Sequence, residues 1–227
     1  MVIVFDLDDT LYDETTYVKS GFKAVASFLH TTYQLPAKEV YLDLLAELEK
    51  GRGSIFDSVL KKKHIFSEKL TRKCVTVYRF HKPEIKLDTV VVNCLKRFKG
   101  YPVYIVTDGN KIVQHNKIKA LGLDKKVKGF YITHRYGVQY AKPSSYCFLK
   151  ICEREKTTPD QVVYIADNLH KDFVGIKPLG FKTIRMLTGP YANIQKHESY
   201  HADMKISSLD ELTDELISKV FRSKKLK

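Results

Sequence analysis

The amino-acid sequence predicts an α/β fold with a parallel sheet and an all-helical insertion near the start of the chain. Short apolar runs rich in β-branched residues recur along the sequence, and from the second run onward each is followed by a stretch of helical character. Residues 14–98, which separate the first two runs, show helical periodicity without a comparable strand signal. Such alternation of strands and helices is typical of parallel sheets with right-handed crossovers.

The predicted strands lie at residues 2–5, 102–107, 129–133, 162–166 and 181–187. Such apolar runs fit strands that are buried on both faces. Helices are expected at residues 110–123, 142–156 and 168–180. Together these elements predict a Rossmann-like core of three layers (α/β/α), with helices on both faces of the sheet.

The insertion is expected to contain helices at residues 15–34, 36–51, 54–64, 67–82 and 86–100, which prolines and glycines separate. We therefore assign residues 1–13 and 99–227 to a core domain and residues 14–98 to an inserted helical cap domain. The insertion starts at the carboxyl end of the first strand, where open α/β sheets bind ligands. It is therefore expected to close over the site as a lid.

The carboxyl-terminal region is expected to end in an amphipathic helix. Ser208 is followed three residues later by Glu211, which is the spacing of a capping box that opens a helix. The basic end RSKKLK is expected to be a solvated terminus.

The composition favours a soluble domain over a membrane protein. The chain has 227 residues, 44% hydrophobic and 29% charged, and no stretch approaches the roughly 20 apolar residues of a membrane span. The first apolar run breaks at Asp6, unlike a signal peptide, so a cytoplasmic location is expected. The four cysteines lack the paired spacing of zinc sites and are expected to be buried thiols.

The formal net charge of +13 leaves three anionic partners open: nucleic acid, a membrane surface and a phosphorylated small molecule. The basic residues are spread along the chain and form no aromatic-basic motif of an RNA-binding type. Nucleic acid is therefore disfavoured, no membrane partner is expected, and a small phosphorylated metabolite is preferred.

Four segments at or after predicted strands carry charged and polar residues. The segment VIVFDLDDT contains the first predicted strand and the residues after it, and VYIVTDGN contains most of the second strand and the residues after it. The segment AKPSS contains a lysine later in the chain, and YIADNLHKD begins in the strand at 162–166 and continues past its end. Because the carboxyl ends of parallel strands meet at one edge, these segments are expected to bring together Asp6, Asp8, Thr107, Lys142, Asp167 and Asp172. Such a carboxylate cluster needs a cation, and hard oxygen ligands suit Mg²⁺.

These four segments resemble the four motifs of the haloacid dehalogenase (HAD) superfamily, in the right order and on the right kinds of element. With the helical insertion between the first and second motifs, the resemblance covers nearly the whole chain. It implies an enzyme of the phosphatase-like branch, which transfers a phosphoryl group to an aspartate. Two positions depart from the family pattern: Ala166 stands where many members have Gly, and Asp108 where the family often has Asn.

The resemblance assigns the chemistry to two aspartates. Asp6 would attack phosphorus and form an aspartyl-phosphate. Asp8 would protonate the leaving oxygen and then activate the hydrolytic water. Residues two apart in an extended segment point the same way, so both can address one substrate. Asp9 would point elsewhere and is expected to be a local hydrogen-bonding or capping residue.

The remaining motif residues would bind phosphate and metal. Thr107 would donate its hydroxyl to the phosphoryl oxygens, with help from backbone N–H groups of the turn at Asp108 and Gly109. Lys142 would stabilise the negative charge of the transferring group. The Asp108 side chain is expected to point away or to bind Lys111. The expected Mg²⁺ ligands are Asp6, Asp8 and Asp167. Asn168 is expected to hydrogen-bond a neighbouring carboxylate, and Asp172 to hold a metal-bound water or Lys142.

Substrate selection is expected to reside in the insertion, because the core groups contact only phosphate. Residues 14–99 hold seventeen Lys or Arg against nine Asp or Glu, and this excess would steer anionic substrates. The candidate residues are Arg52, which two glycines flank, and the tyrosines Tyr12 and Tyr17 at the start of the insertion.

The leading hypothesis is a Mg²⁺-dependent phosphomonoesterase that acts on a sugar phosphate or a nucleoside monophosphate. A 2-haloacid dehalogenase of the same superfamily is an alternative, but it normally lacks the second Asp and works without metal. A phosphomutase shares Asp8 and stays open. A nucleic-acid-binding protein on a HAD scaffold is the alternative from another class. The sequence leaves the oligomeric state, monomer or homodimer, undetermined.

Overall fold

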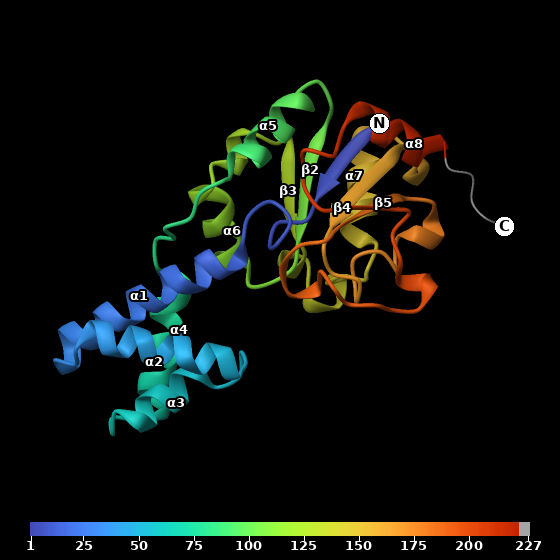
Figure 1. Cartoon of the computed structure of the whole chain (residues 1–227). Helices are drawn as coiled ribbons and strands as arrows, with labels where there is room; N and C mark the ends of the chain where they lie inside the picture. Colours follow the sequence, from blue (N-terminus) through green and yellow to red (C-terminus); the bar gives the residue numbers. More distant parts are fainter. Residues whose placement is uncertain (223–227) are drawn as a thin grey trace. The chain divides into compact units, whose positions relative to one another are not determined.

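Strands form one parallel sheet in the computed structural model, which describes residues 1–222 (Figure 1). The six strands described are β1 (Val2–Phe5), β2 (Val103–Thr107), β3 (Gly129–Ile132), β4 (Val162–Ala166), β5 (Lys182–Met186) and β6 (Met204–Ile206). Their order across the sheet is β3-β2-β1-β4-β5-β6, the order of a doubly wound Rossmann-like fold. The predicted α/β class is therefore confirmed.

The chain divides into two compact units. One unit contains Met1–Glu14 and the chain from Lys86 onward, and the other contains Thr15–Ile85. The first unit holds the sheet and the helices α5 (Thr89–Arg97), α6 (Lys111–Ala120), α7 (Tyr146–Glu155) and α8 (Asp214–Arg222). Helix α5, which the sequence pattern attributes to the insertion, belongs to the sheet unit, and its Val91, Cys94 and Leu95 are buried.

Both faces of the sheet are buried, as continuous apolar strands require. Val4, Tyr104 and Tyr164 belong to one core cluster with Phe148 and Ile151 of α7. The residues that alternate with them along the strands are fully buried as well, namely Ile3, Phe5, Ile105, Val163 and Ile165. The alternation of side chains between the two faces of a strand explains why the central strands are apolar at nearly every position.

The second unit is a bundle of helices. Its helices are α1 (Glu14–Tyr33, of which Glu14 is assigned to the first unit), α2 (Ala37–Lys50), α3 (Ile55–Lys62) and α4 (Glu68–Phe80). Phe22, Leu44, Leu60 and Cys74 are among the residues of its own apolar core. Among the helices described, none combines the length and apolar composition needed to cross a membrane. All four cysteines are buried free thiols, as predicted.

The predicted helix at residues 168–180 is wrong. This segment consists of turns and one short 3₁₀ helix, η5 (Lys177–Leu179). A Cβ at Gly175 would lie 1.7 Å from the carbonyl oxygen of Pro143, so the two backbones pass in contact here. Pro178 also lacks the N–H group that a continuing helix would use.

The last helix begins later than predicted. The N–H of Ser208 donates to Glu211 Oε1 at 3.0 Å, which is one of the two hydrogen bonds of the expected capping box. This hydrogen bond closes a turn and does not open a helix. Helix α8 begins at Asp214, where Thr213 Oγ1 accepts from the N–H of Leu216 at 3.2 Å. The sequence also missed the three-residue strand β6. Of the basic end RSKKLK, Arg222 is the last residue of α8 and residues 223–227 lie outside the described part of the chain.

Gly21 offers a test of the packing in the helical unit. A Cβ at this position of α1 would lie 2.4 Å from the ring of Tyr78 on α4. Replacing a helical glycine by alanine normally stabilises by roughly 0.5–1 kcal/mol. Here we expect Gly21→Ala to lower the free energy of unfolding by about 1–3 kcal/mol, because overpacking strains the helix contact.

Thermal and urea denaturation measure this change. Gly53→Ala is the control, because a Cβ there would meet nothing within 4 Å. A Gly21→Ala protein as stable as the wild type would contradict this account of the packing.

Candidate active site

The candidate site lies at the carboxyl ends of three neighbouring strands. Asp6 follows β1, Thr107 ends β2, and Asp167 follows β4. Phe5 is in register with Ile105 and with Ile165, so the three strands end within two residues of one another at this edge. A cavity of about 180 Å³ opens there, lined by Asp6, Asp8, Asp9, Glu14, Thr107, Asp108, Asp167, Asn168, Lys171 and Tyr191.

Three buried carboxylates meet beside this cavity. Asp6, Asp167 and Asp172 each present an oxygen, and these oxygens lie within 4.8 Å of one another. Burial and the neighbouring carboxylates of Asp172 and Asp8 raise the pKa of Asp6 to about 7, although Lys142 acts in the opposite direction. Burial and the charges of Asp6 and Asp172 raise the pKa of Asp167 to about 8. The protein therefore concentrates negative charge where water cannot disperse it.

Lys142 supplies a positive charge inside this cluster. Its Nζ lies 2.9 Å from Asp6 Oδ1 and 2.7 Å from Asp172 Oδ1. It also donates to the Tyr164 hydroxyl at 2.9 Å. Burial acts to lower the pKa of Lys142, but the charges of Asp172 and Asp6 outweigh it and raise that pKa well above its usual value. Lys142 is therefore charged and held against the proposed nucleophile.

The acidic cluster has the donor set that a hard divalent cation prefers. Oδ1 of Asp6 is buried and makes no hydrogen bond within the described residues, although it lies at ion-pair distance from Lys142. One lysine faces three carboxylates whose oxygens are close enough to share an ion. Carboxylate oxygens are the ligands of Mg²⁺. Asp6 and Asp167, with Asp172 beside them, could hold the metal.

The carboxylate of Asp8 is occupied by three hydrogen-bond donors. Oδ1 accepts from Tyr12 Oη at 2.6 Å and from Lys117 Nζ at 2.7 Å, and Oδ2 accepts from Gln114 Nε2 at 2.7 Å. Burial acts to raise the pKa of Asp8, but Lys117 and these hydrogen bonds outweigh it and lower the pKa. Asp8 is thus an ionised carboxylate in the metal-free protein, which suits a base better than a metal ligand.

Thr107 and Gly109 lie where the second motif predicts a phosphate site. Thr107 is buried, and its Oγ1 accepts from Gln114 Nε2 at 2.6 Å. Since that oxygen accepts from Gln114, its own proton is available to donate to an anion. Gly109 has a φ of 125°, which favours glycine and lets the backbone turn sharply after the strand.

Asp108 does not bind Lys111 in the structure. Its Oδ1 accepts from Thr133 Oγ1 at 2.8 Å and from the N–H of Lys142 at 3.1 Å, and its Oδ2 accepts from Lys171 Nζ at 2.7 Å. Burial acts to raise the pKa of Asp108, but Lys142 and Lys171 outweigh it and lower the pKa. The side chain of Asp108 therefore connects the second, third and fourth motifs.

Residues of the fourth motif support one another. The N–H of Asn168 donates to Asp172 Oδ2 at 2.8 Å, and Asn168 Oδ1 accepts from the N–H of His170 at 2.9 Å. Asp9, expected to act locally, accepts from the N–H of Glu14 at 3.0 Å through Oδ1. These contacts hold the loops that follow β4 and β1.

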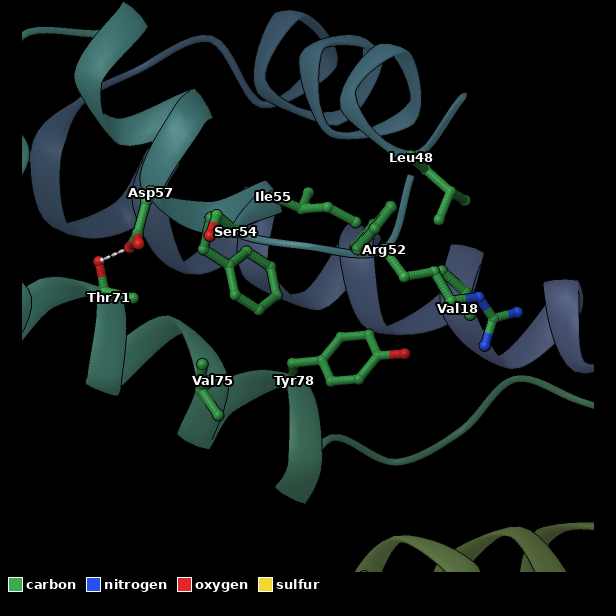
Figure 2. Close-up of a pocket in the computed structure, with 11 residues that line it drawn as sticks. Val18, Leu48, Arg52, Ser54, Ile55, Asp57, Thr71, Val75 and Tyr78 are labelled. Carbon is green, nitrogen blue, oxygen red and sulfur yellow. Dashed lines mark hydrogen bonds between the residues drawn. The ribbon is translucent and has the colours of Figure 1, made fainter. Parts of the chain in front are cut away.

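The other predicted substrate residues, Tyr12, Tyr17 and Arg52, lie outside the four motifs. Tyr12 is buried and its hydroxyl is used by Asp8. Tyr17 is buried in the helical unit, where its hydroxyl donates to the carbonyl of Tyr78 at 3.4 Å. Arg52 lies between α2 and α3 and lines a cavity of about 320 Å³ within the helical unit (Figure 2). In Figure 2 its guanidinium and the Tyr78 hydroxyl point toward one end of that cavity, away from the hydrogen-bonded pair Asp57 and Thr71.

Sequence reasoning missed several polar residues of the site. Gln114 and Lys117 lie on α6, and Lys171 and Tyr164 contact residues of the motifs. The signal that could have found Gln114 and Lys117 is their spacing of three, which places both on one face of a helix directly after the second motif. Both are buried, which is uncommon for a lysine without an ionic partner.

The fold and the site define an α/β enzyme with carboxylates and a lysine gathered at the ends of parallel strands. The model of the haloacid dehalogenase-like hydrolase family matches residues 1–180. The chain therefore belongs to the haloacid dehalogenase-like hydrolases, and the resemblance inferred from the four motifs is confirmed.

Relatives in other organisms cover almost the whole chain. The chain is 31% identical over 225 residues to the glyceraldehyde 3-phosphate phosphatase of Pyrococcus furiosus, and the match covers 95% of this chain and 92% of the relative. It is 28% identical over 224 residues to the enzyme of the same name from Methanocaldococcus jannaschii, with 93% and 95% covered.

Solved structures share the fold at lower identity. A 2-haloacid dehalogenase from Pseudomonas syringae matches with a TM-score of 0.66 and 19% identity, covering 96% of this chain and 98% of the other. The putative HAD-hydrolase YfnB from Bacillus subtilis, bound to magnesium, matches with a TM-score of 0.64 and 19% identity, covering 93% and 96%. At these identities the likeness concerns the fold alone.

The raised pKa values of Asp6 and Asp167 predict how Mg²⁺ binding depends on pH. In the metal-free protein these carboxyls, with pKa values of about 7 and about 8, are partly protonated at neutral pH. Metal binding requires the ionised forms and must release those protons. We expect Mg²⁺ affinity to rise as pH increases from 6 to 8, and about one proton to leave per ion bound near pH 7.

Isothermal titration calorimetry in two buffers of different ionisation enthalpy counts the released protons. Asp167→Asn should weaken Mg²⁺ binding and reduce the proton release. Affinity that is the same at pH 6 and pH 8, without proton release, would argue against a metal at these carboxylates.

Proposed function

We propose that this protein is a Mg²⁺-dependent phosphomonoesterase that forms an aspartyl-phosphate on Asp6 and acts on a small sugar phosphate. The observation that carries the proposal is the position of Asp6, buried between Lys142 and the carboxylates of Asp167 and Asp172. The family match and the relatives named as phosphatases support the same reaction class.

The first step transfers the phosphoryl group to the protein. A carboxylate oxygen of Asp6 forms a bond to phosphorus while the bond from phosphorus to the leaving oxygen breaks. Asp8 takes up the proton of the substrate's phosphate monoanion and passes it to the leaving oxygen, so the alcohol departs neutral. Thr107 donates its hydroxyl hydrogen to the phosphoryl oxygens, and Lys142 offsets the negative charge that builds up on the transferring group.

The second step returns Asp6 to its starting form. Asp8 takes a proton from water as the water oxygen bonds to phosphorus, and the bond between phosphorus and Asp6 breaks. Inorganic phosphate leaves, and the Asp6 carboxylate is restored. Asp8 is suited to this role because its carboxylate is ionised and oriented before the reaction.

When bound, Mg²⁺ would offset the charge of the carboxylates and of the phosphoryl oxygens. Asp6 and Asp167 would be its side-chain ligands. Asp172 orients Lys142 through the 2.7 Å ion pair and receives the N–H of Asn168. The residues that bind metal and those that move protons are therefore separate.

The substrate is proposed to be a triose phosphate or a similar small sugar phosphate. Relatives that cover nearly the whole chain carry the name glyceraldehyde 3-phosphate phosphatase. The cavity at the strand ends measures about 180 Å³, below the roughly 300–1,000 Å³ typical of pockets for larger ligands. Lys171, which pairs with Asp108, also lines this cavity.

The alternatives have less support. A 2-haloacid dehalogenase needs no proton transfer at a second aspartate, and Asp8 is held in place by three donors. A phosphomutase differs only in the acceptor of the phosphoryl group, so product analysis separates it from a phosphatase. Binding of nucleic acid rests on the net charge of +13 alone. A cytoplasmic location stays a prediction.

Asp6→Asn tests the nucleophile. The amide cannot form a stable acyl-phosphate, so we expect phosphate release from glyceraldehyde 3-phosphate with Mg²⁺ to fall by more than about 10³-fold. The variant should keep its fold, because it removes a charge from a crowded acidic cluster. Release of inorganic phosphate and thermal unfolding are the two measurements. Full activity in Asp6→Asn, or halide release from 2-haloacids by a wild type inert to phosphate esters, would reject the proposal.

Arg52→Ala tests the proposed part of the helical unit in substrate selection. If Arg52 binds the part of the substrate beyond the phosphate, kcat/KM for glyceraldehyde 3-phosphate should fall about 10-fold. kcat/KM for p-nitrophenyl phosphate should stay within about 2-fold of the wild type, since that ester lacks the sugar. Arg72→Ala, an exposed arginine paired with Glu68 in the same unit, is the control. Equal losses with both esters would remove Arg52 from substrate selection.

A further inference from the structure

Helix α6 contributes two buried polar side chains to the site that the mechanism above does not use. Gln114 and Lys117 are each only 2% exposed. Lys117 lies three residues after Gln114, so both project from one face of the helix. Burying an amide and an ammonium is costly unless each finds partners. Their partners therefore indicate what the helix does.

Both side chains converge on Asp8. Lys117 Nζ lies 2.7 Å from Asp8 Oδ1, and Gln114 Nε2 lies 2.7 Å from Asp8 Oδ2. The two carboxylate oxygens are thus fixed from one helix, and rotation of the Asp8 side chain would break both contacts. The hydroxyl of Tyr12 adds a third contact at 2.6 Å.

Gln114 also connects the two halves of the site. The same Nε2 donates to Asp8 Oδ2 and, at 2.6 Å, to Thr107 Oγ1. One amide group therefore sets the spacing between the proton-transfer residue and the phosphate-binding hydroxyl. Lys117 extends the network to Glu14 at 3.1 Å, the first residue of α1.

We propose that Gln114 and Lys117 are positioning residues that hold the Asp8 carboxylate for the hydrolysis of phospho-Asp6. This inference rests on the proposed function. All three groups around Asp8 are donors, so they leave one lone pair, on Oδ2, as the acceptor for a water proton. In that step water loses a proton to Asp8, its oxygen bonds to phosphorus, and the bond between phosphorus and Asp6 Oδ breaks.

The substrate p-nitrophenyl phosphate separates this role from a structural one. Its leaving group departs without a proton, so kcat/KM, which reports transfer to Asp6, depends little on Asp8. The later hydrolysis still needs Asp8 as a base. A positioning role therefore affects kcat and spares kcat/KM, whereas general damage to the site lowers both.

The experiment compares Lys117→Met with the wild type under turnover with Mg²⁺. We expect kcat for p-nitrophenyl phosphate to fall about 30-fold or more, because misplacing a catalytic group by an ångström costs on the order of 10²-fold. kcat/KM should change by less than about 3-fold. A burst of p-nitrophenolate equal to the enzyme concentration should appear as phospho-Asp6 accumulates. Lys117→Arg, which keeps a donor and the charge, should recover part of kcat.

Controls keep the outcomes distinct. Lys119→Met removes a lysine of the same helix that pairs with Asp124 at 2.7 Å and is 56% exposed, and it should behave as the wild type. Lys117→Gln, which also removes the positive charge beside Asp8, gives the same readout if Lys117→Met does not fold. Equal losses of kcat and kcat/KM without a burst, or no change at all, would overturn the positioning role. A wild type without phosphatase activity, or an active Asp6→Asn, would instead overturn the proposed function.

Discussion

The repulsion among the buried carboxylates of Asp6, Asp167 and Asp172 is the constraint on which the rest of the site depends. Three acids with oxygens within 4.8 Å of one another would not stay ionised without compensation. Lys142 provides one compensating charge, through contacts of 2.9 Å to Asp6 and 2.7 Å to Asp172. Burial and the charges of Asp6 and Asp172 nevertheless raise the pKa of Asp167. A divalent cation would complete the balance and make Asp6 a carboxylate ready to attack phosphorus.

The parallel sheet produces this concentration of charge. Strands β2, β1 and β4 are adjacent and in register, so residues far apart in sequence reach one edge together. The apolar strands bury the acids and thereby strengthen their interactions. A second network holds the Asp8 carboxylate through donors from α6 and Tyr12. Two aspartates two residues apart therefore have opposite pKa shifts, raised for Asp6 and lowered for Asp8.

The sequence predicted the sheet and the motif residues because both depend on local pattern. Apolar runs identify buried strands, and acids directly after them identify the strand ends where ligands bind. The helix predicted at 168–180 failed because the close approach of Gly175 to Pro143 is a tertiary contact without a local signal. Lys117 was missed for a similar reason, since its helix position looks like a surface lysine until Asp8 is placed beside it. Asp108 was expected to point away or to bind Lys111, but in the fold it pairs with Lys171.

The central claim is that Asp6 becomes covalently phosphorylated, and trapping that species tests it most directly. Magnesium-loaded protein would be quenched in acid during turnover of p-nitrophenyl phosphate, and the peptide containing VFDLDDTLYDE analysed by mass spectrometry. The account predicts one phosphate on Asp6 that hydroxylamine removes, and none in Asp6→Asn. Phosphate on another side chain, or turnover of the ester with no phosphorylated protein under any quench condition, including in Lys117→Met, would contradict it.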